Sequence, residues 1–178
     1  VVSSGRISYY NGSVNALCVP DDLVGFRTLF SSLHHFRPAE ARMILRNAVE
    51  SRSGIGIFEG TQRQPIAILG MLLAPLIVWI LTPRIRPFRW TRLLWTYLLP
   101  VVPLVVLFDG VVSCLRTYTV EELVAMTTEF SSDGYEWEVG EARARGVLAP
   151  VTYLIGYPAL TSQSQIGDKR EARAAQIA

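Results

Sequence analysis

Charged residues are scarce in this sequence, and their distribution is uneven. Asp, Glu, Lys and Arg make up 18% of its 178 residues, against about 25% in a typical soluble domain. The deficit lies in two uncharged apolar runs, QPIAILGMLLAPLIVWILTP at Gln64–Pro83 and LLWTYLLPVVPLVVLF at Leu93–Phe108. A net charge of +2 is too small to indicate nucleic-acid binding, and we predict no nucleic-acid partner. The length suits one domain with a real core.

Cysteine and histidine are rare, with two of each. Cys18 and Cys114 are far apart and have no metal-like or CxxC spacing, so we expect two buried free thiols in a reducing compartment. His34 and His35 are adjacent, and neighbouring side chains in an extended segment point apart. We therefore predict no metal site.

Both ends of the sequence lack familiar signals. No basic segment leads into an apolar stretch near the start, so no signal peptide is predicted. The start, VVSSG, has no Met and resembles the interior of a longer protein. The end, at 159–178, is polar and Ala-rich, and we predict a disordered tail there.

Strands and a helix are predicted to alternate before the apolar runs. Arg6–Tyr10 and Phe26–Ser31 have strand composition, and GIGIFEG at Gly54–Gly60 is a short apolar strand bounded by glycines. Pro38 suits the first position of a helix. Its apolar residues recur at helical spacing on one face, at Ala41, Ile44, Leu45, Ala48 and Val49.

A helix and two strands are predicted after the runs. Thr119 and Glu122 form a capping box at the helix start. Tyr135–Gly140 and Pro150–Tyr157 have strand patterns with no helix between them, so they should pair as an antiparallel hairpin. The sequence therefore predicts an α/β fold whose parallel sheet ends in an antiparallel hairpin.

Three segments resemble the second half of class I S-adenosylmethionine-dependent methyltransferases. GFRTLFSSLHHF with RPAEARMILRNAVES is similar to the fourth strand, its "LHHF" continuation and the next helix of that family. GIGIFEG is similar to the fifth strand. FDGVVSCLRTYTVEELVAMTTEF, YEWEVG and PVTYLIGYP are similar to the terminal helix and the sixth and seventh strands.

This resemblance implies a domain organisation. Residues 1–60 and 109–158 would form a Rossmann-like methyltransferase sheet without its amino-terminal strands, and 61–108 would be an inserted apolar helical hairpin. The family's glycine-rich loop and the acidic residue after it are not in this sequence. We therefore expect a fragment of a longer protein that binds cofactor poorly by itself.

The resemblance also implies a cofactor site for S-adenosylmethionine. Asn15 would lie near the adenine, and Ser31, Leu33 and His34 would line the pocket. A surface loop is an equally good interpretation of His34.

Two carboxylates are candidate substrate or lid residues. Glu59 ends the fifth-strand segment, where ligands bind in open α/β folds, although a solvated loop carboxylate would fit the same position. Asp109 follows an apolar run and is either a general base or, as we favour, a charge at a helix end. No catalytic residue is identified.

The connector between the apolar runs is basic and aromatic. Its predicted membrane-interface residues are Arg84, Arg86, Arg89, Trp90 and Arg92. The first run is just long enough to span a bilayer, the second is short, and both contain prolines. A cytoplasmic connector and a cytoplasmic fold favour an interfacial or re-entrant hairpin. A true spanning hairpin and a helical cap buried against the domain or a dimer partner are the alternatives.

Two functions follow as expectations. The first is a methyltransferase that acts at a membrane surface on an apolar or lipid-like acceptor, either on the cytoplasmic side or as an integral membrane protein. The second is a non-enzymatic membrane protein with two transmembrane helices and degenerate methyltransferase-like flanks.

Overall fold

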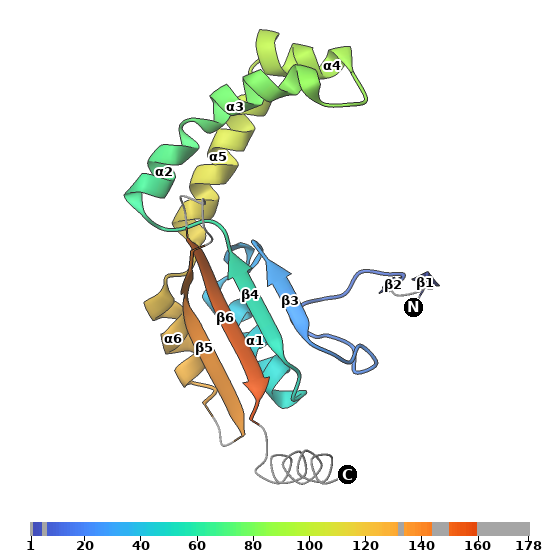
Figure 1. Ribbon diagram of the computed structural model, residues 1–178, viewed down its shortest axis with the longest axis vertical. Coiled ribbons are helices and arrows are strands. Elements are labelled where there is room, and N and C mark those ends of the chain that lie inside the picture. The colour runs from blue at the N-terminus through green and yellow to red at the C-terminus, as the bar shows by residue number, and fades with distance from the viewer. Residues whose placement is uncertain (1, 5–6, 132–133, 144–149, 160–178) are drawn as a thin grey trace, which may run out of the picture.

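The main domain is a four-stranded sheet with helices on one face (Figure 1). The computed structural model describes residues 2–4, 7–131, 134–143 and 150–159. The strands β3 (Arg27–Phe30), β4 (Ile55–Glu59), β5 (Tyr135–Ala142) and β6 (Val151–Pro158) lie in the order β3-β4-β6-β5. The predicted α/β class is confirmed. The tail predicted at 159–178 lies outside the described residues from 160 onwards.

The strand directions follow the predicted pattern. β3 and β4 are parallel, with Thr28 opposite Gly56. β6 is antiparallel to both β4 and β5, with Ile155 opposite Gly56 and Glu138. The last strand of the described chain is therefore central, and the sheet ends in the predicted antiparallel hairpin.

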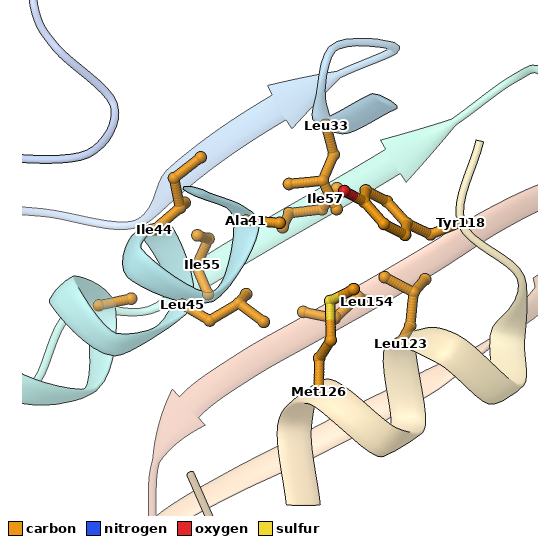
Figure 2. Close-up of a cluster of buried hydrophobic side chains, with 11 residues drawn as sticks. Leu33, Ala41, Ile44, Leu45, Ile55, Ile57, Tyr118, Leu123, Met126 and Leu154 are labelled. Carbon is orange, nitrogen blue, oxygen red and sulfur yellow. The ribbon is translucent and has the colours of Figure 1, made fainter. Parts of the chain in front are cut away.

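The core lies between the sheet and helices α1 (Pro38–Glu50) and α6 (Val120–Thr128), as Figure 2 shows. Pro38 stands in the first turn of α1, and Thr119 caps α6 by accepting from the Glu122 N–H, as predicted. The buried cluster comprises Leu33, Ala41, Ile44, Leu45, Ala48, Ile55, Ile57, Tyr118, Leu123, Met126 and Leu154. The predicted stripe of α1 thus supplies four of its members.

Two expectations for the amino-terminal region are wrong. The described part of the strand predicted at Arg6–Tyr10 does not join the main sheet, because β2 (Ile7–Tyr9) pairs with β1 (Val2–Ser4) in a separate two-stranded sheet. Cys18 is exposed rather than buried, since it lies in a turn where its N–H bonds to the Asn15 carbonyl. Cys114 is buried, and both thiols are free.

A long helical hairpin rises from the end of the sheet to which β3 and β4 point (Figure 1). Its outward limb comprises α2 (Pro65–Met71) and α3 (Ala74–Leu81), followed by the 3₁₀ turn η2 (Thr82–Arg84). Its return limb comprises α4 (Trp90–Leu93), the π-helical turn η3 (Leu94–Leu98) and α5 (Val101–Arg116).

The inner boundary of this hairpin differs from the predicted one at residue 108. α5 runs on to Arg116, so the polar residues Asp109 and Ser113 belong to the same helix as the apolar residues before them. Asp109 is therefore an exposed mid-helix residue and not a helix-end charge. An added Cβ at Gly110 would lie 2.9 Å from the Met71 sulfur, so α2 and α5 pack closely at this level.

One helix is long and apolar enough to cross a membrane. It covers Pro65–Arg84, 20 residues, which corresponds to about 30 Å of helix. The return limb reaches that length only if Trp90–Leu98 and Val101–Arg116 count as one span with a 70° bend. Among the described residues the hairpin thus has one helix that is long and apolar enough to span a membrane, or two if the bent pair is counted.

Candidate functional site

A tight turn follows β3 at the carboxyl edge of the parallel strands. Ser31 has a φ of 44°, in the left-handed region, and its N–H bonds to the Phe58 carbonyl at 2.8 Å. The 3₁₀ turn η1 (Leu33–His35) comes next. Ser31 is exposed, whereas Leu33 and His34 are buried. The predicted cofactor residues Ser31, Leu33 and His34 are therefore neighbours in one turn.

Glu59, the last residue of β4, holds this turn in place. Its Oε1 accepts from the Ser32 N–H at 3.1 Å and from the Leu33 N–H at 2.7 Å. Its Oε2 lies 2.7 Å from Nδ1 of His34. The residue is 1% exposed, so Glu59 is not a solvated loop carboxylate. Burial and three partners give it a positioning role: it fixes the backbone after β3 to the end of β4.

The two histidines were expected to lie in an extended segment, but they do not. They occupy the η1 turn, with ring centroids 4.2 Å apart and planes tilted by 41°. His34 is 4% exposed and bonded to Glu59, so it is not a surface loop histidine. Within the described ranges, no group of three His, Cys, Asp or Glu residues could hold a metal ion.

Both ends of the hairpin are tied to the sheet edge beside this turn. The Thr61 and Thr117 hydroxyls are 2.6 Å apart, which closes the base of the hairpin. Arg116 donates to the His35 carbonyl at 3.0 Å, and the Tyr118 hydroxyl donates to the Phe36 carbonyl at 2.7 Å. The hairpin base and the η1 turn therefore form one connected unit.

The sequence interpretation did not predict these ties. Tyr118 belongs to the core cluster, and its pKa is raised by burial and, to a smaller extent, by the charge of Glu122. The partners of Arg116 and Tyr118 are about 80 positions earlier in the sequence, and no local pattern marks such contacts.

Asn15 lies apart from the other predicted cofactor residues. It forms a local turn in which its Oδ1 accepts from the Leu17 N–H at 3.0 Å. Its neighbours Val14 and Ala16 line an apolar pocket of about 370 Å³ beside the first residues of β3. Ser31 and His34 follow the opposite end of that strand, so the structure does not bring the four residues together.

Pro83 and Pro100 each leave one carbonyl of the hairpin without a helical partner, and the facing limb supplies both bonds. Pro83 and Pro100 have no N–H for the carbonyls of Trp79 and Thr96, four residues earlier. The Tyr97 hydroxyl donates to the Trp79 carbonyl. The Trp79 indole donates to the Thr96 carbonyl at 3.0 Å. This reciprocal clasp suits an apolar environment, where an unpaired carbonyl has no water to bond.

The shaft of the hairpin exposes apolar side chains along both limbs. Ile66 and Phe108 are each 71% exposed. Side chains that are more than half exposed along both limbs are Ile66, Leu69, Leu72, Leu73, Leu76, Ile77, Ile80, Trp90, Leu98, Leu104, Val105 and Phe108. The hairpin is therefore not a cap buried against the described domain. Such a surface indicates a membrane or protein contact.

The predicted interface residues gather at the far end of this shaft. Arg84 and Arg92 donate to the carbonyls of Ile80 and Ile85. Trp90 is 77% exposed and meets the Phe88 ring edge-on, with centroids 5.2 Å apart. The basic and aromatic groups thus lie together, away from the sheet.

Comparisons of the chain with protein-family models, with curated proteins and with solved structures found no match.

Proposed function

We propose that this chain forms part of an S-adenosylmethionine-dependent methyltransferase that acts at a membrane surface on an apolar acceptor. The observation that carries the proposal is the joint position of two features. The turn held by Glu59 and the base of the apolar hairpin share the carboxyl edge of the parallel strands.

The sheet geometry supports the enzyme half of the proposal. In open α/β sheets, ligands bind outside the carboxyl ends of the parallel strands. β3 and β4 are the parallel pair, which is compatible with the fourth and fifth strands that the resemblance implies. The antiparallel pairing of β5 and β6 is likewise compatible with the closing strands that it implies.

The described residues fit one side of a nucleoside cofactor. Ser31 offers an exposed hydroxyl on a left-handed backbone, and Glu59 and His34 hold the turn behind it. S-adenosylmethionine would supply the electrophilic methyl group. Methyl transfer depends chiefly on alignment of donor and acceptor, which a rigid turn provides. The rest of the cofactor needs a glycine-rich loop, which this sequence does not contain.

The hairpin supports the membrane half. Its outward limb, residues 65–81, is apolar throughout, and a helix of that kind is immersed rather than laid on a surface. The hairpin base adjoins the η1 turn through Arg116 and Tyr118. An acceptor dissolved in the bilayer would therefore reach the candidate site along the hairpin.

Calorimetric titration of the intact gene product with S-adenosylmethionine tests the enzyme half. We expect saturable binding, and we expect Glu59→Ala to weaken it because the turn after β3 is released. Glu129→Ala is the matched control, since Glu129 makes an exposed ion pair with Arg42 and, among the described residues, no hydrogen bond to the turn. An absence of binding at high cofactor concentration would overturn the assignment.

In a second candidate function, the chain is a non-enzymatic membrane protein and the hairpin is its functional element. The extent of exposed apolar surface on the shaft favours it. Membrane association that resists carbonate extraction, combined with no cofactor binding, would support this candidate over the first.

A further inference from the structure

The far end of the hairpin carries four arginines and no carboxylate. We call Thr82–Arg92 the arginine tip; it holds Arg84, Arg86, Arg89 and Arg92. The sequence contains no Asp or Glu between Gly60 and Phe108. The tip is also the part of the hairpin farthest from the sheet (Figure 1). Its positive charge therefore has no counter-charge at the tip, since the carboxylate of the return limb, Asp109, lies midway along α5.

The guanidinium groups of the tip are arranged to accept an external anion. Arg84 and Arg92 each donate a hydrogen bond from Nη1 to a backbone carbonyl, which orients the remaining N–H groups. Arg86 and Arg89 are exposed, and within the described residues neither side chain makes a hydrogen bond or an ion pair. A guanidinium binds phosphate oxygens with two parallel N–H bonds.

Aromatic rings flank these arginines. Phe88 and Trp90 pack edge-on at the tip, and Trp95 and Tyr97 lie half-exposed on the return limb. Tryptophan and tyrosine concentrate at the level of lipid headgroups, where one part of the ring is apolar and the other is wet. The apolar shaft below them continues into the same surface.

We infer that the arginine tip binds the phosphate groups of anionic membrane lipids. Charge complementarity selects phosphate, and the apolar shaft with its aromatic rim selects a phosphate embedded in a membrane over one free in solution. The inference rests on the membrane half of the proposed function and adds a preference for lipid charge to it.

Vesicle flotation with the full chain tests this preference. The vesicles contain phosphatidylcholine alone or phosphatidylcholine with phosphatidylglycerol. We expect tighter association with the anionic vesicles, weakened by salt. The double variant Arg86→Gln with Arg89→Gln should lower that association by about 30-fold and leave association with the neutral vesicles unchanged.

The double variant Arg42→Gln with Arg46→Gln is the matched control. It removes the same charge from α1, outside the hairpin. Equal losses in the two double variants, or equal association with neutral and anionic vesicles, would overturn the inference and leave membrane association standing. Inorganic phosphate that abolishes the anionic preference, where chloride at the same ionic strength does not, would also overturn it, because the site would then be one for free phosphate. The cofactor titration does not depend on the vesicle experiments, so it tests the enzyme assignment separately from the lipid preference.

Discussion

Replacement of Glu59 by alanine tests the central contact of the candidate site. The substitution removes the acceptor of two backbone N–H groups, at Ser32 and Leu33, and the partner of His34. An unsatisfied buried N–H costs about 1–3 kcal/mol. The Leu33 N–H is fully buried and the Ser32 N–H is partly buried, so we expect the free energy of unfolding to fall by about 3–4 kcal/mol in total.

Two further variants separate the causes. Glu59→Gln keeps one carbonyl oxygen for the backbone donors. It should lower the free energy of unfolding by about 1 kcal/mol, because the hydrogen bonds lose their charge assistance. Glu129→Ala breaks an exposed ion pair and should cost less than about 1 kcal/mol.

The assay is urea unfolding in detergent micelles, followed by far-ultraviolet circular dichroism. Hydrogen exchange with mass spectrometry on the segment 29–37 reports whether the loss is local. The Ser32 and Leu33 amides should exchange faster in Glu59→Ala than in the wild type. A free energy of unfolding within about 1 kcal/mol of wild type, with unchanged exchange in this segment, would refute the positioning role.

Three other predictions concern the clasp and the core. Tyr97→Phe should lower the free energy of unfolding in detergent by about 1–2 kcal/mol, since the Trp79 carbonyl loses its donor; an unchanged value would contradict the clasp. In a Pro83→Ala background the restored N–H should reduce that cost by about half or more, and an unreduced cost in this double-mutant cycle would show that proline is not the cause. Burial raises the pKa of Tyr135 from 10.0 to about 12. The Tyr135 hydroxyl loses its proton at a lower pH in the unfolded chain than in the folded one. The free energy of unfolding should therefore fall as pH rises from 10.0 to about 12. Tyr135→Phe should flatten that decline, and an equal decline in the variant would contradict this assignment.

Features set by neighbouring residues were predictable from the sequence. Pro38 and the Thr119–Glu122 pair begin their helices by local geometry and hydrogen bonds, and the 3.6-residue period of α1 marked its buried face. The parallel pair and the closing hairpin followed from the order and spacing of strands.

Features that depend on distant residues were not predictable in the same way. Glu59 and His34 are 25 positions apart, and only the fold shows that the carboxylate is buried among three donors. Tyr97 and Trp79 meet because the limbs of the hairpin pack side by side, although Pro83 and Pro100 could have indicated the orphaned carbonyls. Arg6–Tyr10 had strand composition, but composition does not choose the partner strand.

The position of β6 has a consequence for the order in which this protein is made. β6 leaves the ribosome after every other described element, yet it lies between β4 and β5. The whole hairpin is therefore synthesised before β6 can pair with β4 and β5. A hairpin that enters a bilayer during translation would fix the sheet edge at the membrane while β4 still has an open side. Assembly of the sheet would then follow insertion of the hairpin, on a scaffold that the membrane already holds.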